Sequence, residues 1–425
     1  MQTNLADFIK NSPEGQEAES ILRSCVHCGF CLATCPTYQL LGDELDSPRG
    51  RIYLIKQVME GQPVTQKTQL HLDRCLTCRA CETACPSGVQ YGRLIDIGRA
   101  IVEKEVPRGA VDRVKRYALR QALPNASLFS SLLKLGHLFR PLLPSALTKS
   151  LPQSLPSPNP WPPVRHTRTM LVLEGCVQPS LAPGINVSAA RVLDRLGISL
   201  IKASDAGCCG AVSYHLNAQN EGLDYMRRNI DAWWPYVEQI DASVTGPLVE
   251  AIVMTASGCG VTVKEYGHLL KDDPLYAHKA ARISLLTKDI SEIISVELTH
   301  GNNLPTNHSS PNSPKQKLSF HSPCTLQHGM QIRGTVETIL LSAGFELAFV
   351  PDSHLCCGSA GTYSLLQPDL SHQLLTNKVK SLESGQPNQI VTANIGCLTH
   401  IQGGTQIPVR HWIEVLDECT EKSHT

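Results

Sequence analysis

The sequence has little of what would place a protein in a membrane, on nucleic acid or in a secretory pathway. Nowhere in its 425 residues does an apolar stretch approach the roughly 18 residues of a membrane-spanning helix. Lys plus Arg and Asp plus Glu both number 38, so the basic excess that phosphate binding requires is missing. The first twenty residues contain four carboxylates and no apolar run, so we expect no signal peptide and a reducing, cytoplasmic location.

A nucleotide-binding fingerprint is also missing. No Gly-x-Gly-x-x-Gly follows a segment that reads as a strand, and a dinucleotide site of that type needs its glycines between a strand and a helix. We therefore expect neither flavin nor nicotinamide to bind in this chain.

Cysteine, in contrast, is abundant and clustered. The chain has 17 cysteines, and eight of them lie in residues 1–100. In a reducing compartment, clustered cysteines more often bind metal or carry out redox chemistry than form structural disulfides. The cysteines are therefore the candidate functional residues.

The N-terminal cysteines form one motif twice. The segment Cys25-x2-Cys28-x2-Cys31-x3-Cys35-Pro36 is repeated as Cys75-x2-Cys78-x2-Cys81-x3-Cys85-Pro86. This is the bacterial ferredoxin spacing, in which three thiolates hold three corners of a cubane and the fourth cysteine ligates the other cluster. The sequence therefore predicts two [4Fe–4S] clusters. The predicted ligands are Cys25, Cys28, Cys31 and Cys85 for cluster 1, and Cys75, Cys78, Cys81 and Cys35 for cluster 2.

The alternative for this region is a pair of zinc sites. Zinc prefers pairs of Cys-x2-Cys separated by longer gaps, so the triple followed by x3 favours iron–sulfur. Between the motifs lie Arg49 and Arg51, which either offset the negative charge of a cluster or begin a solvated helix.

The C-terminal part repeats a different pattern. Cys176, Cys208-Cys209-Gly210 and Cys259 are matched by Cys324, Cys356-Cys357-Gly358 and Cys397, with 31 residues between the single cysteine and the pair in both halves. In each half, apolar strands precede the cysteines, and a helix that ends at a glycine joins the first two strands; the expected helices are 187–196 and 335–342, and the expected strands are 170–173, 198–201, 251–255, 318–320, 345–350 and 389–392. Because parallel strands end at the same sheet edge, the four cysteines of each half should converge there.

Each converging set is either a metal or redox site or a reduced relic of one. Four histidines lie near these motifs: His215, His321, His354 and His400. His400 stands out because it completes Cys397-x2-His400, whereas the other half has Thr262 in that place. We therefore expect the second set to hold a metal better than the first, through His400. Cys419 has no partner in the repeat and is interpreted as a stray thiol.

The expected fold class is a multidomain α+β protein: an all-α helical ferredoxin-like domain followed by two repeated parallel α/β domains. The expected divisions are a two-cluster domain (1–123), a proline-rich connector (124–168), a first α/β domain (169–300), a flexible linker (301–316) and a second α/β domain (317–425). Within the connector, leucines from 128 to 151 have helical spacing. They indicate either a helix packed on the protein or one that faces a membrane or partner.

Taken together, these motifs resemble one family over nearly the whole chain. Two ferredoxin motifs followed by two Cys-Cys-Gly domains are similar to the iron–sulfur subunit of bacterial glycolate oxidase (glycolate dehydrogenase), as are Asp46–Gly61 and Glu174–Pro179. Heterodisulfide reductase subunits, anaerobic glycerol-3-phosphate dehydrogenase and lactate-utilisation proteins are related.

The resemblance implies a role in electron transfer. It implies that FAD-binding flavoprotein subunits oxidise glycolate to glyoxylate, and that this subunit passes the electrons to a respiratory acceptor, a quinone or a cytochrome. It also implies peripheral association with the inner membrane. The chain alone should then be inactive, because the flavin resides on another polypeptide.

Two other functions stay open. One is a heterodisulfide reductase-like or quinone-reducing catalytic subunit with its chemistry at the Cys-Cys-Gly pockets. Thr262 and His400 stand against it, because they replace the last cysteine of the Cys-x2-Cys of heterodisulfide reductase-type domains. The other is a scaffold or sensor in which the clusters are structural.

Overall fold

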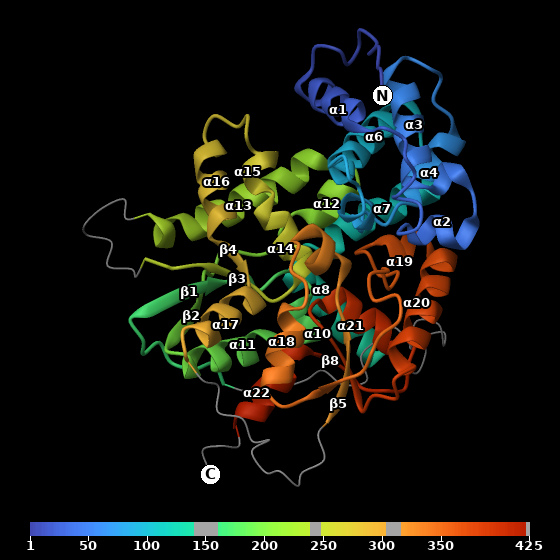
Figure 1. Ribbon diagram of the computed structural model, residues 1–425. Helices are drawn as coiled ribbons and strands as arrows, with labels where there is room; N and C mark the ends of the chain where they lie inside the picture. The colour runs from blue at the N-terminus through green and yellow to red at the C-terminus, as the bar shows by residue number, and fades with distance from the viewer. Residues whose placement is uncertain (140–159, 239–247, 303–315, 422–425) are drawn as a thin grey trace.

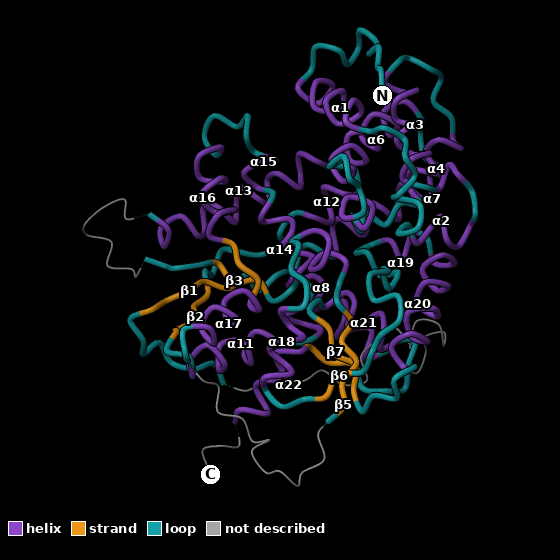
Figure 2. Tube along the Cα trace, viewed as in Figure 1, coloured by secondary structure: helices purple, strands orange, loops and turns teal. Residues whose placement is uncertain are grey.

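The computed structural model describes residues 1–139, 160–238, 248–302 and 316–421. In Figure 1 the blue N-terminal helices lie at the upper right, the green and yellow middle of the chain lies at the left, and the orange and red C-terminal part lies at the lower right. Figure 2 shows that the strands occur only in the two later parts. The expected fold class is confirmed: a helical region precedes two parallel α/β units.

The N-terminal region is built from short helices whose starts are capped. Ser12 and Ser47 accept backbone N–H bonds from Gly15 and Gly50, and a proline follows each serine at the first helical position. The elements are α1 (Pro13–Ser24), α2 (Pro36–Leu41), η1 (Glu44–Asp46), α3 (Pro48–Met59), α4 (Gln66–Asp73), α5 (Ala80–Thr83), α6 (Tyr91–Glu105), α7 (Ala110–Ala122) and α8 (Ala126–Leu138).

The first α/β unit has four parallel strands in the order β2-β1-β3-β4. Its elements are β1 (Arg168–Val172), α10 (Gln178–Leu181), α11 (Gly184–Arg195), β2 (Ile198–Lys202), α12 (Ala211–His215), α13 (Gln219–Val237), β3 (Ile252–Met254), α14 (Ser257–Lys264), α15 (Tyr266–Leu269), α16 (Ala277–Leu286), β4 (Thr287–Asp289) and α17 (Ile290–Thr299).

The second unit repeats this topology with the strand order β6-β5-β7-β8. Its elements are β5 (Lys317–His321), a π turn η4 (Thr325–Gly329), α18 (Thr335–Ser342), β6 (Glu346–Leu347), α19 (Tyr363–Leu366), α20 (Pro368–Glu383), β7 (Gln389–Thr392), α21 (Ile395–Gln402), β8 (Val409–His411) and α22 (Trp412–Glu421). In both sheets the chain moves outward in opposite directions from the central pair, β1 and β3 or β5 and β7. The carboxyl ends of such a pair form a crevice in open α/β sheets.

The expected helices and strands are present, with three differences. Each sheet has a fourth strand that the sequence pattern did not reveal, β4 and β8, and β6 covers only two of the six residues expected at 345–350. The helix expected from Leu128 corresponds to α8, which ends at Leu138. Positions 140–151 lie outside the described residues, and so do positions 303–315 of the expected linker. Among the described helices, none has both the length and the hydropathy needed to cross a bilayer.

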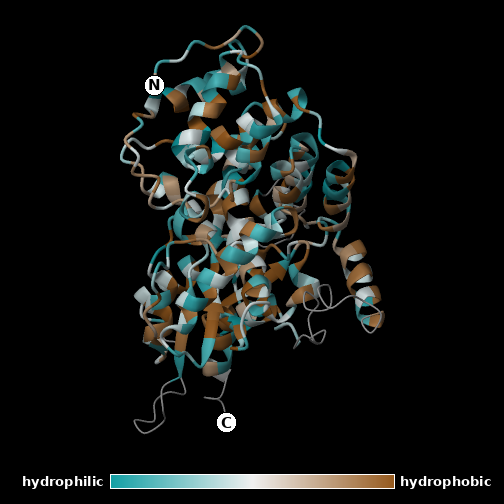
Figure 3. Ribbon diagram, turned by 90° about the vertical axis from the view of Figure 1, so that its right-hand side faces the viewer, coloured by the Kyte–Doolittle hydropathy of each residue, from teal (hydrophilic) through white to brown (hydrophobic). Residues whose placement is uncertain are grey.

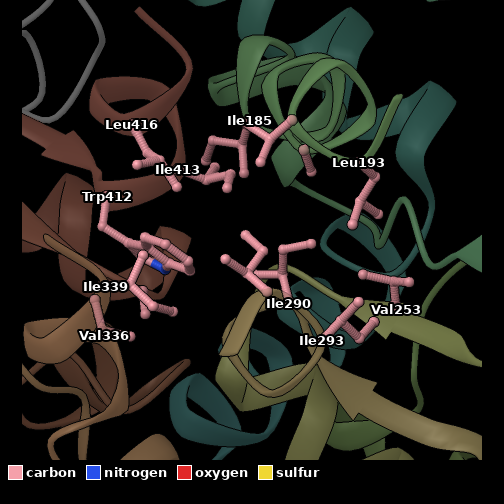
Figure 4. Close-up of a cluster of buried hydrophobic side chains, with 14 of the residues drawn as sticks. Ile185, Leu193, Val253, Ile290, Ile293, Val336, Ile339, Trp412, Ile413 and Leu416 are labelled. Atoms are coloured by element: carbon pink, nitrogen blue, oxygen red, sulfur yellow. The ribbon is translucent and has the colours of Figure 1, made fainter. Parts of the chain in front are cut away.

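The two α/β units share one hydrophobic core. Figure 4 shows Ile185 and Ile290 of the first unit facing Trp412 and Ile339 of the second, and all four are buried. The hydropathy colouring of Figure 3 shows hydrophobic residues along the strands. At the edge of this core, buried Asp417 accepts hydrogen bonds from Arg191 and Arg195, which join α22 to α11. The repeated units are therefore packed as one body.

Candidate metal centres

The backbone turns in the same way in both ferredoxin motifs. The residues on either side of the second cysteine adopt positive φ: His27 and Gly29 in the first loop, Thr77 and Arg79 in the second. Left-handed residues turn the chain sharply, so the three sulfurs of each loop face one side. This is the tight turn that the two-residue spacing predicts.

The first loop lines a hollow at the protein surface. Its walls include Arg49, Val89 and Tyr91, and Cys28 on its rim is exposed. Burial raises the pKa of Cys31 to about 11, so without a metal this thiol is protonated. The cysteines that line this hollow are Cys25, Cys28, Cys31, Cys81 and Cys85.

The second loop lines an adjoining hollow that is more enclosed, because Cys35, Cys75 and Cys81 are buried and Cys78 is half-buried. Burial raises the pKa of Cys78 and Cys81 well above the usual thiol value, with neighbouring thiols adding to the effect. Cys81, Pro48 and Tyr91 line both hollows, so the two are separated by a thin wall. The cysteines that line the second hollow are Cys35, Cys75, Cys78 and Cys81.

In each hollow, three consecutive motif cysteines meet the last cysteine of the opposite motif. Cys85 faces the first loop and Cys35 faces the second. The sulfur donor sets fit two [4Fe–4S] clusters, since the eight cysteines divide into four for each hollow when Cys81, which lines both, is counted with the second, and a cubane needs four thiolates.

Arg51 is a functional candidate for which the sequence allowed two environments, beside a cluster or at the start of a solvated helix. It is fully buried on α3, so it does not begin a solvated helix. Its Nε donates to the His71 carbonyl at 2.7 Å, its Nη2 donates to Asp46 at 3.3 Å, and its Nη1 lies 4.0 Å from the Cys35 sulfur. Asp46 is also paired with Arg74 at 2.8 Å. A fixed positive charge therefore lies beside the second hollow, while partly exposed Arg49 lines the first.

The cysteines of the first α/β unit converge as expected. Cys208 lies beside Cys176 and Cys209, and Cys209 also lies beside Cys259. Hydrogen bonds from Cys208 and Cys259 lower the pKa of Cys209 well below the usual thiol value. Nearby His215 bonds elsewhere: its Nδ1 lies 3.1 Å from Asp96 of α6 and joins this unit to the N-terminal helices.

The second unit also gathers its four cysteines. The Cys324 thiol lies 3.9 Å from the Cys356 sulfur, and the contacts continue through Cys357 to Cys397. Cys324 and Cys356 pack in one cluster with Leu76 of the second ferredoxin loop, and Cys78 packs against this cluster. The second set therefore adjoins the enclosed hollow.

The histidine closest to this set is not the one that sequence spacing favoured. His321, Cys357 and Cys397 have ligand atoms within 4.8 Å of one another, and all three residues are buried. Burial lowers the pKa of His321 well below its usual value, so its imidazole is neutral. His400 lies outside this group, with its Nε2 3.3 Å from Ser371 Oγ. His354 offers its backbone carbonyl to His328.

The glycine of each Cys-Cys-Gly motif is required by the backbone. Gly210 and Gly358 have φ near +90°, and a Cβ on either would lie about 2.5 Å from a carbonyl oxygen, that of Gly222 or Ser371. In both motifs the glycine N–H points to the sulfur of the first cysteine at 3.4 Å. The two pockets are thus built on one plan. Cys419, which has no counterpart in the repeat, is buried and donates to the Ala343 carbonyl at 3.7 Å.

The N-terminal helices are fastened to both units. Arg79, in the second ferredoxin loop, forms a two-pronged ion pair with Glu265 at 2.5 and 2.8 Å. On the other unit, Tyr363 donates to the Arg74 carbonyl at 3.1 Å. Sequence reasoning did not find these contacts, because charged residues far apart in the chain carry no local signal of their pairing.

Known proteins share this arrangement. Residues 21–89 match the family described as "4Fe-4S dicluster domain", and residues 170–264 and 318–402 match the family described as "Cysteine-rich domain". The chain is 56% identical over 422 residues to the "Glycolate oxidase iron-sulfur subunit" of Escherichia coli (strain K12), which covers 99% of this chain and 100% of that protein.

Two further relatives are more distant. The "Probable glycolate oxidase iron-sulfur subunit" of Bacillus subtilis (strain 168) is 31% identical, over 94% of this chain and 92% of that protein. The "Lactate utilization protein A" of Bacillus pumilus (strain SAFR-032) is 25% identical, over 57% of this chain and 96% of that protein. The resemblance seen in the motifs is confirmed, and the chain belongs to the family of glycolate oxidase iron–sulfur subunits.

Proposed function

We propose that this chain is the electron-transfer subunit of a flavin-dependent glycolate dehydrogenase and relays electrons through two [4Fe–4S] clusters towards the respiratory chain. The observation that carries the proposal is the crossed lining of the two hollows, in which Cys85 joins the first loop and Cys35 joins the second. Cluster 1 is then held by Cys25, Cys28, Cys31 and Cys85, and cluster 2 by Cys75, Cys78, Cys81 and Cys35. When bound, the cubanes supply one-electron acceptors and donors.

Electrons enter at cluster 1. Cys28 is exposed, and Val26 and Phe30 beside it are 67% and 65% exposed. Exposed apolar side chains around a redox centre suit the docking of a partner protein. In our proposal this partner is the FAD-binding subunit that oxidises glycolate to glyoxylate, since the relative that is 56% identical is an iron–sulfur subunit of glycolate oxidase. The shared wall of Tyr91 and Cys81 keeps the second cluster within a short distance of the first.

The acceptor is a quinone or a cytochrome, and the protein associates peripherally with the inner membrane. Support for membrane association comes from α8, where Leu133 is buried but Leu128, Leu132, Leu135 and Leu138 are exposed. These four leucines recur at helical spacing and form an apolar stripe of the kind that lies in a membrane interface.

The docking step can be tested with one substitution and a matched control. Phe30→Gln should weaken binding to the flavoprotein subunits while the chain keeps its iron. Phe349→Gln, which changes a phenylalanine that is 83% exposed on the second unit, should leave binding unchanged. Binding is measured by co-purification under anaerobic conditions, and iron and sulfide are counted in the same samples. Equal binding by both variants would contradict the proposed entry point.

A second candidate function is catalysis by a dithiol, as in a heterodisulfide reductase-like or quinone-reducing subunit. It is favoured by one observation: the Cys324 and Cys356 sulfurs lie 3.9 Å apart, and both residues pack beside Cys78. Oxidation of this pair to a disulfide would release two electrons and two protons. Cys324→Ser would abolish quinone reduction if the pair were catalytic, and would leave it intact if electrons leave from cluster 2.

A further inference from the structure

The strongest unexplained group in the described residues is the buried trio of His321, Cys357 and Cys397. His321 is 1% exposed, and neither of its ring nitrogens has a hydrogen-bond partner. An unpaired buried polar group costs free energy, so native proteins almost always give it a partner. Two cysteine sulfurs lie close to the ring, and the ligand atoms of all three residues are within 4.8 Å of one another.

The repeat provides an internal comparison. His321 lies three residues before Cys324, and the residue three before Cys176 in the first unit is Leu173, also buried. Likewise, Asn394 lies three residues before Cys397 and donates to its sulfur at 3.6 Å, whereas Ala256 takes that place before Cys259. The two units share a fold and four cysteines, but only the second has polar side chains at these two positions. Packing alone does not require those groups, because the first unit fills the same places with apolar side chains.

We propose that His321, Cys357 and Cys397 bind one zinc ion. Two thiolates and an imidazole are ligands that zinc prefers, and in a tetrahedral site they lie roughly 3.5–4 Å apart, close to the separation of these three groups. A cubane is less suitable, because its ligands bind separate iron atoms and are spaced more widely. The two thiol protons leave to solvent as the metal binds. The fourth position remains for a water molecule.

The position of the site in the fold suggests what the zinc does. His321 ends β5, Cys397 lies on α21 just after β7, and these two strands are paired at the crevice of the second sheet. Cys357 brings in the loop that carries Cys356, which packs beside Cys78. Zinc has no redox chemistry, so this ion would act as a clamp that holds the loop against the cluster 2 cysteines. The site is independent of the direction of electron flow.

The test uses the full chain, purified without oxygen. We expect about one zinc atom in addition to about eight irons, and X-ray absorption at the zinc edge should show two sulfur ligands at about 2.3 Å and nitrogen or oxygen ligands at about 2.0–2.1 Å. His321→Leu, which copies the first unit, and Cys357→Ser should lose the zinc but keep the irons. Cys209→Ser, the same change in the first unit, should keep both.

Three results would overturn the proposal. The first is a full chain that contains its irons but no stoichiometric zinc. The second is zinc that persists in His321→Leu or has only sulfur neighbours. The third is extra iron, beyond the two cubanes, that disappears in Cys357→Ser. The full-chain measurement stands on its own if a variant fails to fold, and a failure of the proposed electron transfer would leave the zinc count unchanged.

Discussion

The Arg51 guanidinium is fully buried with its Nη1 4.0 Å from the sulfur of Cys35. A buried cation stabilises the more negative, reduced form of a neighbouring cluster, because low-dielectric surroundings strengthen the interaction. Arg51→Gln should therefore lower the midpoint potential of cluster 2, by an amount on the order of tens of mV. Asp46 keeps Arg74 as a partner in this variant.

Redox titration monitored by paramagnetic resonance measures this effect. Arg49→Gln is the matched control, since Arg49 lines the other hollow and its side chain is 31% exposed. Arg49→Gln should shift the midpoint potential of cluster 1 by less than Arg51→Gln shifts that of cluster 2, because solvent screens the charge of Arg49. An unchanged cluster 2 potential in Arg51→Gln would show that Arg51 serves only through its bonds to Asp46 and the His71 carbonyl.

Cys35→Ser tests the crossed ligand assignment. Cys35 belongs to the first motif in sequence but lines the hollow of the second. The substitution should disturb the cluster held by Cys75, Cys78 and Cys81, and the resonance signal of that cluster should change first in the reduced protein. A change confined to the cluster of Cys25 would mean that each motif keeps its own four ligands.

Alanine substitutions at Gly358 and Gly361 allow the cost of backbone strain to be distinguished from the cost of a steric clash. Both glycines have positive φ, but a Cβ on Gly358 would lie 2.6 Å from the Ser371 carbonyl oxygen, whereas a Cβ on Gly361 would have nothing within 4 Å. Gly361→Ala should cost about 1–2 kcal/mol from conformation alone. Gly358→Ala should cost more and lower the thermal midpoint further. Equal midpoints would mean that the Cys-Cys-Gly loop can move away from α20.

The buried carboxyl group of Asp289 should make the stability of the folded protein depend on pH. It is buried, its Oδ1 caps α17 at Ser291, and its Oδ2 has no partner; burial raises its pKa to about 6. Because the folded pKa exceeds the unfolded value, the folded state binds the proton more tightly. The stability gained from that proton is present at low pH and is lost as pH rises from about 4 to about 6.

Asp289→Asn cannot ionise but can still cap the helix. Relative to the native chain, it should gain stability as pH rises, by about 1.5 kcal/mol more at pH 7.5 than at pH 5. Thermal unfolding at several pH values measures the difference between the two proteins. A difference that stays constant with pH would contradict a raised pKa for Asp289.

The sequence predicted what local patterns encode. The boundaries of α18 and β7 agree with the expected ones, because an apolar period and a terminal glycine or polar turn mark them. The fourth strands were missed because β4 and β8 have three residues each, too few to show a period. Sequence alone also could not predict the contact between Arg79 and Glu265, which depends on tertiary packing.

His400 and His321 show that closeness to a cysteine in sequence does not ensure closeness in space. His400 was favoured because it lies three residues after Cys397, yet its ring bonds Ser371 on α20. His321 is 76 residues from Cys397 in the chain but ends the strand paired with β7, so it lies beside the cysteines in space. Parallel strands end at one edge of a sheet, and this places every residue at a strand end there, His321 as well as the cysteines.

In our proposal, electrons from glycolate pass through this chain's two clusters. This proposal is tested most directly by mixing the chain, with its clusters oxidised, with the flavoprotein subunits and glycolate in an anaerobic stopped-flow instrument. We predict that the visible absorption of both clusters bleaches as they are reduced, and that the chain alone with glycolate shows no change. Reduction of the acceptor at full rate while the clusters stay oxidised, or oxidation of glycolate by the chain alone, would contradict the account.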